Sequence, residues 1–164
     1  MIRQIHLSVK VTGLLVTALF LLATACKKDS TDTSSNNTVT PAPPSKTQLL
    51  TSKNWVVTAL TCNPAYMGST DMYQMIPACS RDNLVKFNND SSRTVTFDEG
   101  SAKCNASDPQ TTTDTWTLKD NDATLLMGKD NYKVESLDAS TLKLSCAVTM
   151  DGKNYMVTET YGHQ

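Results

Sequence analysis

Hydrophobic and polar residues alternate along most of the chain from residue 49 onward. The clearest pair of runs is Leu142–Met150 and Asn154–Tyr161, separated by an Asp-Gly pair at positions 151 and 152. Such a pair between two alternating runs favours a two-residue type I′ turn, because both turn positions need a positive φ. The sequence therefore predicts a tight hairpin with Met150 opposite Lys153.

This register places apolar residues opposite each other on one face of the hairpin. The predicted pairs are Val148 with Tyr155, Cys146 with Val157, Leu144 with Glu159, and Leu142 with Tyr161. Glu159 is the one charge on this face. Because a buried charge needs a partner, Glu159 either orients the polar head of a ligand, or it lies at a rim in water or pairs with Arg81, Arg93 or a lysine.

A second hairpin is predicted around the polar turn at residues 88–92, which is rich in Asn, Asp and Ser. The apolar residues that share a face are Val85 and Phe87 before the turn, and Val95 and Phe97 after it. Both runs can therefore turn the same face toward a core.

Cys79 and Cys104 lie nearly symmetrically about this turn, so the hairpin brings them close together. A strict ladder would put them on opposite faces, and a bulge or frayed end, as at Gly100, has to correct that. A disulfide here closes a loop of about 25 residues and contributes roughly 3–4 kcal/mol in the chain-entropy treatment.

We predict eight short strands in all. They are Trp55–Thr61, the two runs around residues 88–92, Thr113–Lys119, Ala123–Met127, Tyr132–Leu137, Leu142–Met150 and Asn154–Tyr161. Strands at this spacing, joined by tight turns, predict an all-β antiparallel meander that closes as a barrel or sandwich. The expected core residues are Trp55, Phe87, Phe97, Trp116 and Tyr132.

The amino-terminal residues predict export and lipid anchoring. Residues 1–25 have a basic start, an apolar run and small residues at the end, as a signal peptide does. Cys26 follows directly, and the stretch before it resembles a bacterial lipobox with Ala23 in place of the usual leucine. We expect acylation of Cys26, which anchors the chain in a membrane; the alternative is an ordinary secretory leader.

Lys27 rather than an aspartate follows Cys26, which resembles lipoproteins of the outer membrane. We therefore expect the protein at the cell outer membrane, on its periplasmic or surface-exposed face. Residues 26–48 are mostly Ser, Thr, Asn and Pro, and this composition predicts a disordered tether. The folded domain is then residues 49–164.

Four further cysteines are widely spaced and contain no C-x-x-C pair. In an exported chain this pattern favours two disulfides over a zinc site. Three pairings are possible, and if Cys79 pairs with Cys104, then Cys62 is left for Cys146. The alternative is that some of them are buried free thiols.

An ordered set of residues also carries a family resemblance. The set is Leu50-x4-Trp55, Cys79-x-x-Asp82-Asn83-x3-Phe87, Gly100-x3-Cys104, Trp116-x-Leu118 and Tyr132-x4-Leu137-x4-Leu142-x-Leu144. Across about residues 49–161 it resembles the lipocalin-like domain family of bacterial outer-membrane lipoproteins. The resemblance implies an eight-stranded up-and-down barrel, or a flattened one, in which Trp55 plugs the closed end. It supplies no catalytic residues, and Lys53 stands at the glycine of the lipocalin Gly-x-Trp hallmark.

Residues 62–79, which we call the lid segment, form the longest stretch without a predicted strand. In a barrel this segment follows the first strand and can lie across the open mouth. Together with Glu159, its candidate ligand-binding residues are Tyr66, Met72, Tyr73 and Met75. The methionines at 67, 72 and 75 also suit Cu(I), but no histidine or thiolate assists them. We therefore expect a packed lid and no metal or other cofactor.

Charge and histidine content narrow the function further. The net charge of −1 gives no electrostatic footprint for nucleic acid. His6 lies in the leader and His163 is next to last, so a histidine-based triad or a multi-histidine metal site is excluded for the mature chain. We expect a monomer that is not an enzyme.

Two hypotheses remain open. In the first, the anchored barrel binds a small apolar or amphipathic ligand. In the second, the barrel is filled by its own side chains and acts as a structural or protein-binding module of the cell envelope, as an inhibitor or a complex subunit. An apolar void of a few hundred cubic ångströms supports the first, and a packed interior argues against it.

Overall fold

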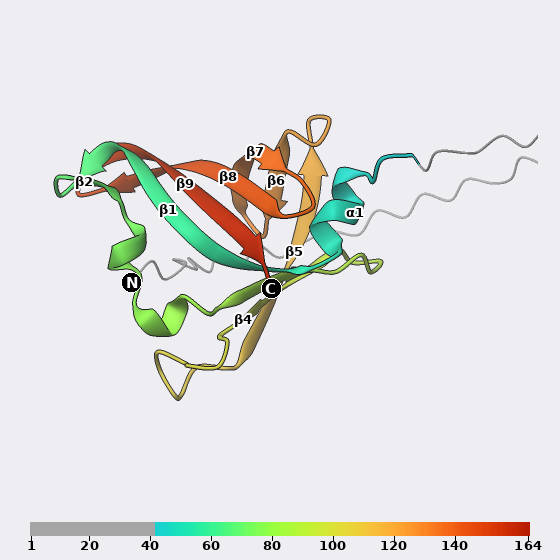
Figure 1. Ribbon diagram of the computed structural model, residues 1–164, viewed down its shortest axis with the longest axis horizontal. Helices are drawn as coiled ribbons and strands as arrows, with labels where there is room; N and C mark the ends of the chain where they lie inside the picture. Colours follow the sequence, from blue (N-terminus) through green and yellow to red (C-terminus); the bar gives the residue numbers. More distant parts are fainter. Residues whose placement is uncertain (1–41) are drawn as a thin grey trace, which may run out of the picture. The chain divides into compact units, whose positions relative to one another are not determined.

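The structure is a computed structural model that describes residues 42–164. The signal peptide predicted at residues 1–25, the acylation site Cys26 and most of the tether predicted at residues 26–48 lie outside the described residues. Strands dominate the part that is described (Figure 1). The elements are α1 (Lys46–Thr51), β1 (Asn54–Tyr66), β2 (Ser69–Asp71), the 3-10 turns η1 (Tyr73–Met75) and η2 (Ala78–Ser80), β3 (Leu84–Phe87), β4 (Thr94–Asp98), β5 (Thr111–Lys119), β6 (Thr124–Met127), β7 (Asp130–Leu137), β8 (Thr141–Met150) and β9 (Lys153–His163).

Eight of these strands close into an antiparallel up-and-down barrel. From β3 to β9 each strand pairs with the next one in the sequence, β1 pairs with β3, and β1 also pairs with β9. The extra strand β2 pairs with the far end of β1, where β3 no longer accompanies it. The predicted eight-stranded barrel is thus confirmed, with one strand added to it.

The β8–β9 hairpin has the register that its turn predicts. Met150 pairs with Lys153, and the ladder continues through Leu142 opposite Tyr161 to Thr141 opposite Gly162. The Asp and Gly of the turn have φ angles of 49° and 72°, which a type I′ turn requires. The two turn residues, Asp151 and Gly152, therefore determine which side chains of this hairpin face the barrel interior.

The β3–β4 hairpin is also confirmed. Val85 pairs with Phe97, and Phe87 pairs with Val95, so all four side chains share one face. The Phe87 ring meets the Trp116 ring edge-on, with ring centroids 5.6 Å apart. Such an edge-to-face pair is a favourable arrangement for two aromatic rings in a core.

A central cluster of apolar side chains fills the closed half of the barrel. Its buried members are Leu50, Trp55, Phe87, Val95, Trp116, Leu125, Met127, Leu142, Leu144 and Tyr161. Trp55 is fully buried, and its Nε1 donates a 2.8 Å hydrogen bond to the backbone oxygen of Leu50. Trp55 therefore plugs the closed end as expected, and Phe97 and Tyr132 pack against the cluster from partly buried positions.

The helix α1 was not predicted. Ser45 and Gln48 form a capping box, in which the Ser45 side chain accepts from the Gln48 amide and the Gln48 side chain accepts from the Ser45 amide. The Lys46 ammonium then donates to the backbone oxygen of Asp122 in the β5–β6 turn, at 3.1 Å. Regular structure therefore begins at Lys46, so the expected disorder does not hold for residues 46–48.

The disulfide between Cys79 and Cys104 is confirmed, with the two Cα atoms 5.1 Å apart. Neither cysteine lies in the β3–β4 ladder, because Cys79 belongs to η2 and β4 ends at Asp98. Gly100 has a φ of 67°, and a Cβ there would come within 2.6 Å of the Asp82 backbone oxygen. The chain therefore leaves the ladder through a turn that only glycine fits. This is the predicted frayed end, and it lets Cys79 and Cys104 meet although a strict ladder would place them on opposite faces.

The predicted disulfide between Cys62 and Cys146 is wrong: both cysteines are free. Val157 of β9 pairs with Cys62 on one side and with Cys146 on the other. The two cysteines are therefore two strand spacings apart, about 9–10 Å between Cα atoms. That distance exceeds the roughly 7 Å that a disulfide can span. Closure of the barrel through β9 is what separates the two thiols.

We expect the Cys79→Ser/Cys104→Ser double variant to lower the free energy of unfolding by about 3 kcal/mol, because the loop-closure constraint on the unfolded chain is lost. Urea denaturation of the protein carrying Cys26→Ser measures this change. A reducing agent should produce the same loss in the parent protein, and the Cys146→Ser variant is the control that leaves the disulfide intact. An unchanged denaturation midpoint under reduction would contradict the prediction.

Candidate functional site

The two ends of the barrel differ. At the closed end, α1 lies beside the β3–β4, β5–β6 and β7–β8 turns, and the Lys53 ammonium donates to the backbone oxygen of Ala139 at 2.8 Å. The lid segment and the β6–β7 and β8–β9 turns lie at the opposite end, which we call the mouth. In Figure 1 the far ends of β1, β8 and β9, with β2, project together beyond β6 and β7.

The lid segment packs onto this projecting part of the sheet. Its first residues, up to Tyr66, continue strand β1, and the chain then returns through β2 and η1. Met72 is 4 % exposed, and its amide donates to the Leu60 backbone oxygen at 2.9 Å. The buried residues here, which we call the mouth cluster, are Leu60, Cys62, Met72, Tyr155 and Val157.

The other predicted lid residues divide between packing and exposure. Tyr66 and Tyr73 are partly buried against the mouth cluster. The ring of Tyr66 lies edge-on to Tyr155, with centroids 5.6 Å apart, and its hydroxyl donates to the Asp151 carboxylate at 3.1 Å. Met75 is exposed, so it does not belong to the same packed group.

Arg81 holds the lid segment in place. Its guanidinium lies 5.2 Å from the centre of the Tyr73 ring, a cation–π distance. The Nε of Arg81 also donates to the Ile76 backbone oxygen at 3.0 Å. This arginine is therefore bound to the lid and is not paired with Glu159.

Glu159 faces the barrel interior at the boundary between the two clusters. In the ladder it pairs with Leu144 on one side and Leu60 on the other, and both of these leucines are buried. The Tyr161 hydroxyl, two residues along the same face of β9, donates to its carboxylate. The residue as a whole is partly buried.

Three other side chains interact electrostatically with Glu159 or with its neighbours. We call this group the Glu159 cluster, and its members are Asp130, Tyr132, Cys146, Glu159 and Tyr161. Burial raises the pKa of the Glu159 carboxyl, although the Tyr161 hydrogen bond opposes the rise. Burial, with the negative charge of Glu159 and Asp130, raises the pKa of the Cys146 thiol to about 11, so this thiol stays protonated at neutral pH.

The β6–β7 hairpin places Tyr132 in this cluster. Its register pairs Tyr132 with the buried Leu125, so Tyr132 faces the interior and packs on the central cluster. Lys133, opposite Thr124 and Ser145, lies on the outer face, where its ammonium pairs with Glu135 at 2.9 Å. An irregularity between Val134 and Ser136 shifts the register of β7 against β8 by one residue, so that Val134 and Leu137 both face the core.

The structure rules out some of the alternatives for Glu159, and its role toward a ligand stays a prediction. The carboxyl group is neither in open water at a rim nor paired with Arg81 or Arg93: the Arg93 guanidinium lies 5.1 Å from the centre of the Trp116 ring instead. Within residues 42–164, no lysine or arginine forms an ion pair with Glu159. Its one hydrogen-bond partner there is the hydroxyl of Tyr161.

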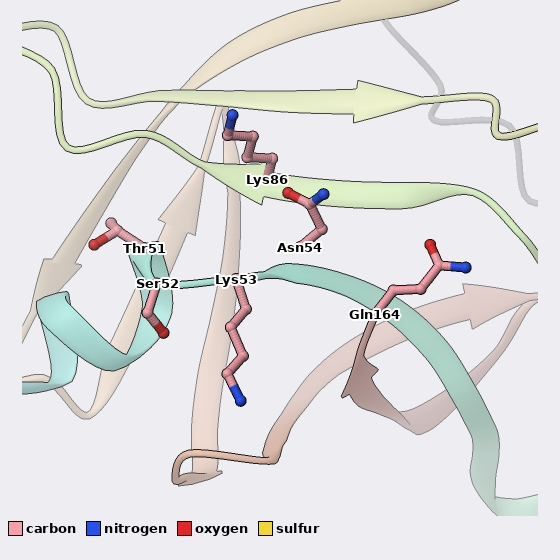
Figure 2. A pocket seen from close by; sticks show the side chains of 6 residues that line it. All are labelled: Thr51, Ser52, Lys53, Asn54, Lys86 and Gln164. Atoms are coloured by element: carbon pink, nitrogen blue, oxygen red, sulfur yellow. The ribbon is translucent and has the colours of Figure 1, made fainter.

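A polar hollow of about 340 Å³ lies at the closed end, outside the barrel interior, and Figure 2 shows the side chains around it. The lining residues are Thr51, Ser52, Lys53, Asn54, Lys86 and Gln164. The side chains of Lys53 and Lys86 point to opposite sides (Figure 2), and the Lys53 ammonium already donates to Ala139. Because the two charges do not converge, this hollow is a poor anion site.

Two further observations concern residues 42–164 as a whole. No three His, Cys, Asp or Glu side chains in this part of the chain gather in a way that could hold a metal ion. None of its helices is long and apolar enough to cross a membrane.

Part of this site could have been found in the sequence. Tyr161 follows Glu159 by two positions on the same strand face, so the hairpin register already placed them together. Tyr132 was missed as a neighbour because its level in the sheet depends on how β7 pairs with β8 across a register shift, which the sequence pattern does not show. The five-residue cluster is therefore a product of the closed sheet more than of any motif.

Fold and interior together define the class of protein. A closed eight-stranded meander with a tryptophan plug at one end is a small barrel of the lipocalin type. Residues 51–144, more than half of the chain, match the lipocalin-like domain family, and the chain belongs to this family. Among curated proteins, none matches the chain.

We expect the Glu159→Gln variant to be more stable than the parent protein at neutral pH and equally stable at low pH. The folded pKa of Glu159 is raised, so the folded state keeps a proton that the unfolded state has lost, and stability falls as pH rises through the folded pKa. Glutamine keeps an acceptor for Tyr161 and has no charge to bury. Thermal unfolding between pH 4 and 8 measures the difference.

The matched control is Glu135→Gln on the outer face. The hydrogen bonds from Ser145 and Lys133 lower the pKa of Glu135, so its contribution to stability is present at neutral pH and is lost as pH falls. The two variants should therefore change the pH profile in opposite directions. Parallel profiles would show that the Glu159 carboxyl is not desolvated.

Proposed function

We propose that this protein is an acylated envelope lipoprotein whose barrel binds a small amphipathic ligand at its mouth. The observation that carries the proposal is the Glu159 carboxyl: it faces the interior opposite two buried leucines, and it has no cationic partner among residues 42–164. Burying a carboxylate without a counter-ion lowers stability. Residues that break the rules of a stable core in this way are commonly part of a functional site.

The packing of the interior limits where a ligand can bind. The central cluster fills the barrel from the Trp55 plug up to Leu144 and Tyr161, so the deep apolar void of the first hypothesis is not supported. The proposed site lies at the upper edge of this cluster, where Glu159 is opposite Leu144 of the central cluster and Leu60 of the mouth cluster. There the polar Glu159 cluster would contact the head of a ligand, and the mouth cluster under the lid would contact its apolar part.

The second hypothesis, a filled barrel that acts as a structural or protein-binding module, has support of its own. The packed central cluster favours it. So do Met67, Met75 and Met156, which are exposed on the projecting part of the sheet and the lid, because methionines suit adaptable protein contacts. It does not explain why an unpaired carboxyl is kept inside the barrel, and for that reason we place it second.

The lipid anchor is proposed from the residues before and after Cys26. We expect Cys26→Ser to move the protein from the membrane fraction to the soluble fraction and to abolish incorporation of a labelled fatty acid, since acyl chains provide the attachment. The Cys62→Ser variant, which keeps the amino-terminal cysteine, is the control. Membrane retention of an unlabelled Cys26→Ser protein would contradict an acyl anchor.

For the ligand, we expect native mass spectrometry of the protein purified from membranes to show a non-covalent adduct. The Cys146→Phe variant should lose this adduct, because Cys146 is partly exposed beside Glu159 and a larger side chain would occupy the site. Glu135→Gln, on the outer face, should keep it. A protein without any adduct, and with no affinity for added amphiphiles, would favour the filled barrel instead.

A further inference from the structure

The far part of β8 has a neighbouring strand on one side only. Its ladder with β7 ends at Ser145, whereas its ladder with β9 continues to Met150. Within residues 42–164, positions 146–150 therefore pair with β9 alone, and in Figure 1 this part of β8 projects beyond β7. An open strand edge of this kind presents backbone N–H and C=O groups with which a further strand can pair.

The β8–β9 turn determines which backbone groups face the open side. Met150 and Lys153 flank a two-residue turn, so they exchange both of their backbone hydrogen bonds. Along an antiparallel strand the direction of these groups alternates from one residue to the next. The N–H and C=O groups of Ala147 and Thr149 therefore point away from β9, toward the open side. They supply two donors and two acceptors in a row.

This open stretch lacks the charges that commonly protect a sheet edge. Residues 144–150 contain no charged residue and no proline. The open stretches of β2, β5 and β7, by contrast, contain Asp71, Asp114 and Asp130. A strand added to β8 would thus meet no charge along the edge.

The outer face of the β8–β9 hairpin becomes apolar at the same level. Ala147 pairs with Met156 across the two strands, and both side chains are exposed on this face. The neighbouring pairs on the outer face are polar: Thr149 with Asn154, and Ser145 with Thr158. The apolar pair gives an added strand a side-chain contact beside its backbone hydrogen bonds, because it lies next to the open groups of Ala147.

We infer that the open edge of β8 pairs with the same edge of a second copy of the chain, so that two barrels share one continuous sheet. A two-fold axis beside Val148 places Ala147 of each copy opposite Thr149 of the other, and each of these two pairs exchanges two hydrogen bonds. All the open groups of both residues are then satisfied. The uncharged edge lets a copy pair with itself, since no like charges come to lie opposite each other.

This dimer goes beyond the proposed ligand-binding function and depends neither on Glu159 nor on a ligand. It replaces the monomer expected from the sequence. The edge is short, so the interface belongs to the small, transient class. Attachment of many copies to one membrane would favour it, because anchoring raises their local concentration.

Sedimentation equilibrium of the purified protein carrying Cys26→Ser tests the inference. We expect a monomer at about 10 µM and a growing fraction of dimer toward about 1 mM, as a weak interface gives. Thr149→Pro should abolish the dimer, because proline has no N–H to donate. The barrel should stay folded, since the N–H of residue 149 is not used in the ladder with β9.

A second variant keeps the backbone donor. Thr149→Lys should also abolish the dimer, because it places an ammonium group of each copy beside the two-fold axis. The matched control is Thr113→Lys, which changes another exposed threonine on an open stretch, that of β5, and should dimerise as the parent does. A parent that stays monomeric throughout would overturn the inference, and so would association that both Thr149 variants leave unchanged.

Cysteine cross-linking tests the register in the acylated chain at the membrane. In a Cys146→Ser background, Val148→Cys should give a disulfide-linked dimer after addition of an oxidant, because opposed residues without mutual hydrogen bonds have Cα atoms about 4.5 Å apart. Thr113→Cys in the same background should stay monomeric. Equal yields from the two variants would show random collision and count against the dimer.

The amino-terminal segment of the same chain is the competing occupant of the edge. If it covers the edge, the protein carrying Cys26→Ser stays monomeric and begins to associate once residues 27–41 are deleted. That result would overturn the pairing of two full chains. Association that is the same with and without residues 27–41, and that Thr149→Pro abolishes, would support it.

Discussion

The pairing of β9 with both β1 and β8 is the constraint on which the rest of this structure depends. It turns a meander with two open edges into a closed barrel, and it runs along nearly the whole length of β9. Each interior-facing residue of β9 is thereby flanked by residues of β1 and β8. The interior position of Glu159, the packing of Tyr161 in the central cluster and the separation of the two free thiols all follow from this one pairing.

The same closure explains why the barrel is packed at one end and polar at the other. Near the plug, all eight strands contribute side chains, and large residues such as Trp55 and Trp116 fill the space between them. Beyond Ser145 the β7–β8 ladder ends while β8 and β9 continue, so fewer strands surround each interior-facing residue there. The lid segment covers part of this end of the barrel by placing Met72 against Leu60. Glu159 and Cys146 remain partly exposed.

Local chemistry in the sequence was enough to predict the strands, the Asp-Gly register and the disulfide of the β3–β4 hairpin, since each depends on residues close together in the chain. The helix α1 was also within reach, because Ser45-x-x-Gln48 is a capping-box pattern. The predicted disulfide between Cys62 and Cys146 was wrong because pairing the remaining cysteines by elimination assumes that they lie close enough to bond. Only the closed sheet shows that β9 lies between them. The surroundings of Glu159 depend on a one-residue bulge, and such shifts leave no periodic trace.

The β6–β7 hairpin explains why no cation of β7 accompanies Glu159. Its register pairs Tyr132 with the buried Leu125 and Lys133 with Thr124, so Tyr132 faces the interior and Lys133 faces outward. The Lys133 ammonium pairs there with Glu135. The irregularity between Val134 and Ser136 then has a packing role. Because Val134 and Leu137 are three positions apart, a regular strand would place them on opposite faces, and the one-residue shift lets both pack against the central cluster.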